Sequence, residues 1–235
     1  MNIVDAILIL AILLCGVLGY KAGFIKSVVS ALGIVVIFYL SYLFKNPLAE
    51  WFTFNLPFFR FFGFFKDITI LNVVVYQLIA FLIIFSLLSI IYSLVVKLSG
   101  AIEKILKATI ILGIPSKILG FIIGLIEGLF LSSIILMILT LPIFNIPYLK
   151  ESKVKDAILE AVPIVSTVSS STNKAINEIT DLKETYEGSK EDFNAKTLDI
   201  LLKYKVIEYD YAKKLYDIGK LDFKGAKKVI NKYKK

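Results

Sequence analysis

Apolar residues gather in four long runs within the first 141 positions of the chain, and the sparse charged residues of this part lie mostly between them. About 20 helical residues are needed to cross the hydrocarbon core of a bilayer, which is about 30 Å thick. The pattern therefore predicts four transmembrane helices. They are expected over Ile3–Tyr20, Ile25–Phe44, Ile70–Val96 and Ile118–Leu141.

Only four residues, Lys21–Phe24, separate the first two runs. One straight helix through both runs would be too long for a bilayer. It would also hold Lys21 and Lys26 at mid-membrane, at a cost of about 2.5–3.5 kcal/mol each. The chain must therefore turn at this point and form a tight helical hairpin.

Two connections between runs are expected to lie at the membrane surface. Residues 45–67 are dense in phenylalanine and include Trp51, and such aromatic segments favour the headgroup boundary, so this segment is expected to be interfacial or shallowly re-entrant. Residues 102–110 place apolar side chains on one helical face and charged side chains on the other, which predicts a short amphipathic helix on the membrane.

From Lys150 onward the pattern changes to that of amphipathic, water-exposed helices. Apolar positions keep helical spacing from Val154 to Val165, with a kink expected at Pro163, and again from Ile176 to Gly188. The prediction is an all-α protein. It comprises a four-helix transmembrane domain over residues 1–149 and a soluble helical tail over residues 150–235.

The end of the tail contains a weak internal repeat, in which residues 206–217 and 220–231 align with an offset of fourteen. The repeat predicts two short helices that form a small docking module. Glu208 and Asp222 are expected at the N-terminal ends of these helices, and Gly219 at the stop between them.

The composition agrees with a membrane protein: 57% of the 235 residues are hydrophobic, 20% are charged, and the mean hydropathy is +0.79. The net charge of +8 is carried almost entirely by lysines that flank the spans or lie in the tail, and Arg60 is the single arginine. This distribution favours the positive residues that border membrane helices over a nucleic-acid surface. The apolar run before Cys15 lacks a basic start and a small-residue cleavage site, so it is interpreted as a retained span.

Catalytic and cofactor chemistry find no support in the sequence. Cys15 is alone and histidine is absent, which removes a disulfide framework and most zinc sites. No nucleophile with a neighbouring base and no phosphate-binding loop appears. The chain is therefore not expected to be an enzyme or to bind a cofactor or metal.

Two ridges of small residues run along the first and fourth spans, with one small residue at every fourth position. Residues four apart lie on one helical face, so each ridge lets another backbone approach closely. We expect the ridges to pack against each other within one chain; a homodimer through either ridge is the alternative. The ridges comprise Ala11, Cys15, Gly19, Gly23 and Ser27, and Ser116, Gly120, Gly124, Gly128 and Ser132.

Two carboxylates lie within the apolar runs. Asp5 is expected to be an acid in the first turn of its helix, stabilised by the helix dipole. On a helical wheel Glu127 falls beside Gly120, so it is predicted to face the packed interior and not lipid. Burial at that depth penalises its ionised form. It is either a protonated structural acid or a carboxylate that binds a proton or solute. Its candidate partners in the third span are Gln77, Ser86, Ser89 and Ser93.

These features together resemble the colicin V production (CvpA) family. The resemblance rests on Asp5 in the first span, the Gly-x-x-x-Gly-Phe turn at Gly19–Phe24, and the glycine-stepped fourth span with Leu119-Gly120, Gly124 and Gly128. It covers about Met1 to Pro163, including the segment Glu151–Ala157 after the last span.

The resemblance implies a multi-pass bacterial plasma-membrane protein, without enzymatic activity, that takes part in toxin production or export and in envelope maintenance. The tail is expected to bind membrane or envelope proteins. A small transporter or channel that uses Glu127 is the alternative. Near the spans, six basic residues fall on each side of the membrane, and the weight of Lys21 and Lys26 beside the first helix favours both termini outside.

Overall fold

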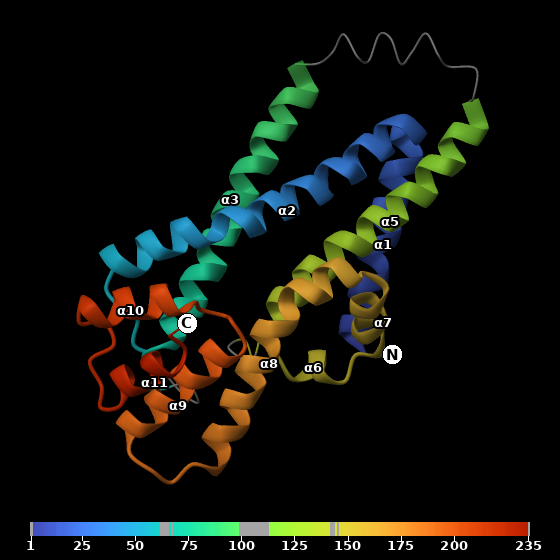
Figure 1. The fold of residues 1–235 in the computed structure, drawn as a ribbon. Coiled ribbons are helices and arrows are strands. Elements are labelled where there is room, and N and C mark those ends of the chain that lie inside the picture. The colour runs from blue at the N-terminus through green and yellow to red at the C-terminus, as the bar shows by residue number, and fades with distance from the viewer. Residues whose placement is uncertain are drawn as a thin grey trace. The chain divides into compact units, whose positions relative to one another are not determined.

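The computed structural model describes residues 2–61, 66, 68–98, 113–141, 144 and 146–234, and throughout these residues the chain is helical without strands. The four long helices are α1 (Ile3–Ala22), α2 (Phe24–Asn55), α3 (Leu71–Leu98) and α5 (Gly113–Leu139). Each is long and apolar enough to cross a membrane (Figure 1). The predicted all-α fold with four membrane-crossing helices is confirmed. The expected amphipathic helix at residues 102–110 lies outside the described residues.

Six shorter helices follow. They are α6 (Pro147–Lys150), α7 (Lys153–Ala161), α8 (Pro163–Thr185), α9 (Lys190–Lys203), α10 (Tyr209–Asp217) and α11 (Ala226–Lys232). The break expected at Pro163 is present, since α8 begins at this proline, whose missing N–H is no loss in a first turn.

The internal repeat predicted the two terminal helices in part. Glu208 is the N-cap residue of α10, and Gly219 follows that helix with a φ of +74°. Asp222 was wrongly placed at the start of the second helix. The chain instead passes through Gly225 at a φ of +93°, so α11 begins only at Ala226.

The tight hairpin forms at Gly23. Helix α1 ends at Ala22, the Gly23 N–H donates to the Gly19 carbonyl at 2.9 Å, and α2 begins at Phe24. The φ of Gly23 is +81°, a conformation that a residue with a side chain rarely adopts. A single glycine therefore allows the reversal between two long helices.

Helix α2 runs eleven residues beyond the predicted end at Phe44, and it continues through Pro47 to Asn55. Pro47 lacks the N–H that would bond within the helix, so local propensity favours a break here. The extension is stabilised by its surroundings, because Ala49 and Thr53 are buried and the Thr53 hydroxyl donates to the Ala49 carbonyl at 2.7 Å.

The chain divides into two compact units, which do not coincide with the predicted boundary between residues 149 and 150. Unit 1 comprises residues 1–44, 81–140 and 146–166; unit 2 comprises residues 45–80, 141–145 and 167–235. Helices α2 and α3 each contribute to both units.

In unit 1, three helices meet around Phe38, which is almost fully buried. Its ring contacts Phe81 of α3 and Phe130 of α5 edge to face, with centroid distances of 5.7 and 5.6 Å. Farther along the α2–α3 pair, the Tyr92 ring lies over Gly33 and its hydroxyl donates to the Val29 carbonyl at 2.8 Å.

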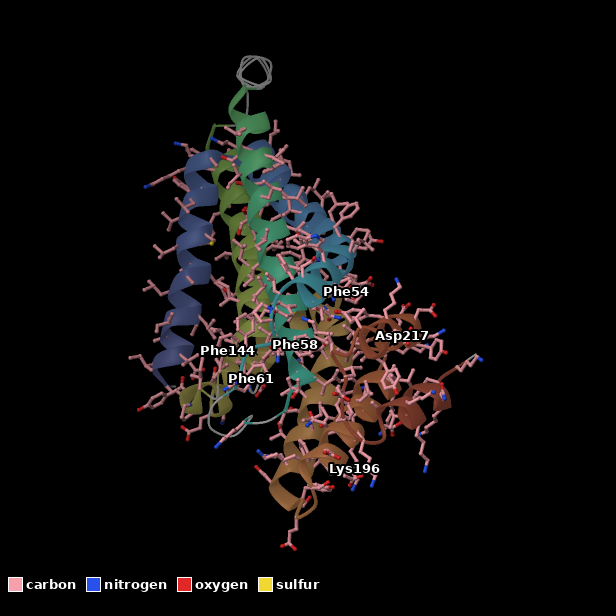
Figure 2. All side chains as sticks on the ribbon, turned by 90° about the vertical axis from the view of Figure 1, so that its left-hand side faces the viewer. Phe54, Phe58, Phe61, Phe144, Lys196 and Asp217 are labelled. Carbon is pink, nitrogen blue, oxygen red and sulfur yellow. The ribbon has the colours of Figure 1, made fainter. Side chains whose placement is uncertain are left out.

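Unit 2 has a continuous apolar core made by the start of α3 and the tail helices. Tyr211 of α10 packs on this core, and Phe54 and Phe61, from α2 and the connection after it, lie against it (Figure 2). The fully buried members include Leu71 and Val73 of α3, Ile176 and Ile179 of α8, Leu198 and Leu201 of α9, and Leu215 of α10. The first turns of α3 are thus covered by protein side chains.

Candidate functional site

Helices α1 and α5 run antiparallel and side by side, with their glycine ridges facing each other (Figure 1). A methyl group added to Gly19 would lie less than 3.0 Å from the backbone of Gly120, and one added to Gly124 would lie less than 3.0 Å from the carbonyl of Cys15. One added to Gly128 would meet Cys15 and Ile12. The two backbones therefore touch along this α1–α5 seam, at a separation that only glycine permits.

Serine hydroxyls fix the end of the seam at the hairpin. The Ser116 Oγ atom, at the start of α5, accepts a hydrogen bond from the Phe24 N–H at 3.1 Å. The Ser27 hydroxyl donates to the Gly19 carbonyl at 3.2 Å. Ser116 thereby satisfies the Phe24 N–H, which the break at Gly23 leaves without a helical partner. Ser27 adds a second bond to the Gly19 carbonyl, which also accepts from the Gly23 N–H. Each ridge is occupied by the other, so a homodimer through either ridge would require the seam to open.

Asp5 lies at the far end of α1 and is 3% exposed. It forms a capping box with Asn2, in which the Asn2 N–H donates to Asp5 Oδ2 and the Asp5 N–H donates to Asn2 Oδ1, both at 3.0 Å. Asp5 Oδ1 also accepts from the Ser152 hydroxyl at 2.6 Å and from the Val154 N–H at 3.4 Å. The carboxylate thus joins the first turn of α1 to the start of α7.

We call Asn2, Asp5, Tyr148, Ser152 and Val154 the Asp5 latch. Asn2 contributes a further bond, from its side-chain amide to the Tyr148 carbonyl at 2.6 Å. Ser152 acts twice, because its oxygen also accepts from the Lys155 N–H at 3.0 Å as the N-cap of α7. Sequence analysis identified Asp5 but missed Ser152. The available signal was a serine directly before a helical pattern.

An apolar cluster supports the latch. Leu8 of α1, Leu136 of α5, Leu149 of α6 and Ile158 of α7 are buried against one another. The segment after the fourth long helix therefore folds back onto the first helix, held by both apolar contacts and a charge-assisted polar network.

Glu127 is half-buried, and its Oε1 atom accepts a hydrogen bond from the Ser30 hydroxyl of α2 at 2.8 Å. The prediction of a partner in the third span is wrong. The hairpin is hydrogen-bonded to the start of α5, which brings the first turns of α2 beside that helix. Of the predicted partners, Gln77 belongs to unit 2, Ser86 and Ser93 are exposed, and Ser89 is half-buried.

In unit 2, helix α10 lies along the last turns of α2. The Tyr211 hydroxyl donates to Thr53 Oγ1 at 2.6 Å, and the Tyr211 ring packs edge to face on Phe54. Burial raises the pKa of Tyr211 to about 12. Beyond α10, Lys220 donates to the Leu56 carbonyl at 2.6 Å and lies over the Phe58 ring.

A second polar contact in unit 2 uses Gln77. Its side-chain amide donates to the Val206 carbonyl at 3.0 Å and its oxygen accepts from Lys45 at 3.3 Å. Within the described ranges no group of three or more histidine, cysteine, aspartate or glutamate side chains could hold a metal ion.

Residues 4–163 match the protein family described as Colicin V production protein. The match covers about two thirds of the chain and includes all four long helices. The chain belongs to the Colicin V production protein family. The family region runs from residue 4 to Pro163, so it contains the α1–α5 seam and every residue of the Asp5 latch except Asn2, whereas α9, α10 and α11 lie beyond it. No curated protein and no solved structure matches the chain.

Proposed function

We propose that this member of the Colicin V production family is an accessory protein of the bacterial plasma membrane that supports the production or export of a peptide toxin and the maintenance of the envelope. It acts by binding other membrane or envelope proteins, without catalysis. The observation that carries the proposal is the Asp5 latch. Its buried carboxylate is used to hold α1, α6 and α7 together, which suits a rigid platform.

The family assignment supports the link to toxin production, and the packing supports a platform. Polar groups in the seam bond to nearby backbone atoms, as Ser27 does with Gly19 and Ser116 with Phe24. The tail beyond the family region offers additional surface for partners.

The test is deletion of the gene in the bacterium that carries it, with secreted peptide toxin and sensitivity to envelope stress as the readouts. We expect both to change and the parent chain to restore them. Gly124→Leu, which disrupts the seam, should not restore them, whereas Leu10→Ala on the exposed face of α1 should. An unchanged deletion strain would refute the proposal.

The contacts within each unit bear on membrane sidedness. The start of α1 bonds to residues 148–154, and residues 53–56 bond to residues 211–220. Four crossings put the N-terminus, the second connection and the tail on one side of the membrane, and the contacts inside each unit agree with that count. We propose that this side is outside, because Lys21 and Lys26 border the opposite end of the first hairpin.

Cysteine labelling tests this orientation in a chain with Cys15 replaced by alanine. A membrane-impermeant thiol reagent applied to intact cells should label Glu187→Cys and should not label Ser99→Cys until the cells are opened. The reverse pattern would place the tail in the cytoplasm and move the search for its partners there.

A second candidate function, a proton- or solute-coupled transporter, is favoured only by the Glu127–Ser30 hydrogen bond. An intramembrane carboxylate that is half-buried is a recurrent feature of such proteins. Glu127→Gln keeps the size and removes the charge, so proton-driven flux into proteoliposomes should fall strongly if this function holds. Absence of flux in the parent, or flux unchanged by the substitution, would exclude it.

A further inference from the structure

The positive charge of the tail is confined to its end. Residues 203–235 contain eleven lysines and four acidic residues, a net charge of +7, whereas residues 150–202 contain seven lysines and ten acidic residues, a net charge of −3. The basic portion is the part of the tail that forms α10 and α11 and their flanking turns.

Among its described residues, this portion has several exposed lysines without an acidic partner, and four of them lie on α10, on α11 or in the turn before α11. Lys203 and Lys232 are paired at 2.9 Å with Glu178 and Asp199. In the described part of the chain no such ion pair involves the exposed side chains of Lys213, Lys224, Lys227 and Lys228. We call these four residues the terminal lysine set.

One face of α10 and one face of α11 are anchored in the unit 2 core. Ala212 and Leu215 of α10 and Ala226 and Ile230 of α11 are buried in the unit 2 core. The neighbouring lysines at 213, 227 and 228 therefore lie on the outer side of both helices. Anchored backbones reduce the entropy that the set would lose on binding a charged surface.

The depth of α10 relative to the bilayer can be inferred from the spacing of charged residues along α2. Lys26 and Lys45 are nineteen residues apart on this helix, about 28 Å at the usual rise, which matches the hydrocarbon thickness. The segment just beyond Lys45 then lies among the headgroups. Its exposed rings agree with this depth, because Trp51 is 55% and Phe59 is 50% exposed.

Helix α10 and the turn after it bond directly to this headgroup-level segment. The contacts are Tyr211 to Thr53, Lys220 to Leu56, and Lys214 to Glu50 at 4.0 Å. Charge and depth therefore coincide at α10, where Lys213 lies on a helix that is fixed beside the part of α2 that leaves the hydrocarbon core. Helix α11, which carries Lys227 and Lys228, packs against α10.

We propose that α10 and α11 bind the anionic phospholipid headgroups of the bilayer in which the chain is embedded, through the terminal lysine set. Lysine ammonium groups on flexible stems suit diffuse attraction to lipid phosphates more than stereospecific recognition. Such attraction grows with each lysine near the surface and falls off within about 10 Å in ordinary salt. The surface would hold the tail against the membrane whenever anionic lipid is present.

The test uses the full chain in nanodiscs made of phosphatidylcholine alone or with roughly 30% phosphatidylglycerol, which gives the bilayer a negative surface potential. Hydrogen exchange is followed over α10 and α11. We expect exchange there to slow by about tenfold with phosphatidylglycerol, and 0.5 M salt (an ionic strength that shortens the screening length to about 4 Å) to remove the difference.

A variant with all four lysines of the terminal set changed to glutamine should lose the difference between the two lipids. The matched control changes Lys174, Lys183, Lys190 and Lys196 to glutamine, which removes the same charge from α8 and α9, and it should keep the difference. Equal exchange in both lipids for the parent, or equal loss in both variants, would overturn the proposal. Slowing by an added acidic protein alone would also overturn it.

Discussion

Helices α1 and α5 approach until their backbones touch, whereas the helices of unit 2 are held apart by leucine and isoleucine side chains that fill the space between them. The seam contains almost no side-chain volume at Gly19, Gly120 and Gly124. The core of unit 2 depends on buried side chains such as Leu198 and Leu201.

The difference follows from the surroundings of each pair. Apolar burial contributes to stability when it removes side chains from water, and it contributes little when the alternative is lipid. Helices in lipid therefore gain from close backbone contact, and helices of a polar tail gain from a side-chain core. One chain thus uses both means of association. Deleting side-chain atoms should weaken the core of unit 2, and adding them should weaken the α1–α5 seam.

Leu201→Ala should have the largest effect. Leu201 is fully buried in the unit 2 core, and truncation of such a residue costs about 2–5 kcal/mol. Hydrogen exchange of the purified protein should speed up over α9, α10 and α11. Leu10→Ala, the same change on the exposed face of α1, should have almost no effect. Equal effects would mean that the distinction between the two regions is wrong.

Gly124→Ala should act on the other region. The added methyl group would collide with the backbone carbonyl of Cys15, so the helices must separate, at a cost of about 3 kcal/mol. Thermal melting in detergent should show a lower Tm and faster exchange over α1 and α5. Gly16→Ala provides the control, because the atoms nearest to its methyl group would belong to the side chains of Leu125 and Phe121, which can move, and not to the backbone. A parent-like melt of Gly124→Ala would show that the backbones are not in contact.

Asp5→Asn tests whether polar bonds supplement the seam. The change places an amide donor against the Asn2 N–H or the Ser152 hydroxyl and removes charge-assisted bonds, with an expected loss of about 2 kcal/mol. Exchange should increase over α6 and α7. Asp156→Asn, an exposed acid in the first turn of α7, is the control. If Ser152→Ala had no smaller effect in the Asp5→Asn background than in the parent, the latch would not be a coupled unit.

Tyr211→Phe should have the smallest effect, about 1 kcal/mol, because it removes one buried hydrogen bond to Thr53 and keeps the ring. The pKa of Tyr211 is raised to about 12, above its value of about 10 in the unfolded chain. The stabilisation by its proton is therefore complete below pH 10 and is lost as the pH rises toward 12. The measurement is a pH titration of tyrosinate absorbance. The difference in absorbance between the parent and Tyr211→Phe should show a transition at a pH near 12. Tyr209→Phe, which lacks this bond, should leave stability unchanged.

The features that sequence analysis predicted well depend on residues close together in the chain. Four apolar runs, the hairpin near Gly23 and the breaks at Pro163 and Gly219 follow from local periodicity and backbone preference. Helix α9 was missed although Ser189 and the acids after it form a recognisable helix start.

Contacts between residues far apart in the chain could not be predicted from local sequence pattern. Asp5 and Ser152 are 147 residues apart, and Tyr211 and Thr53 are 158 apart. The sequence indicated that a carboxylate within an apolar run, such as Glu127, needs a partner, but the choice of Ser30 depends on how the hairpin meets α5. The continuation of α2 past Pro47 likewise depends on tertiary packing, which overrides local propensity.

The makeup of unit 2 has a consequence for biosynthesis. Its core contains residues from the start of α3 and from α11. The part of α3 that ends at Ala80 therefore cannot complete this core until Ile230 has been synthesised. At about 5–20 residues per second, the ribosome needs roughly 8 to 30 s for those 150 residues. During this interval the apolar residues from Ile70 to Val74 have no tail to cover them, and they must stay in lipid or be shielded by a chaperone. Completion of unit 2 is therefore a post-insertion step, and a chain whose synthesis stops within the tail leaves these residues as a mark that quality-control proteases can recognise.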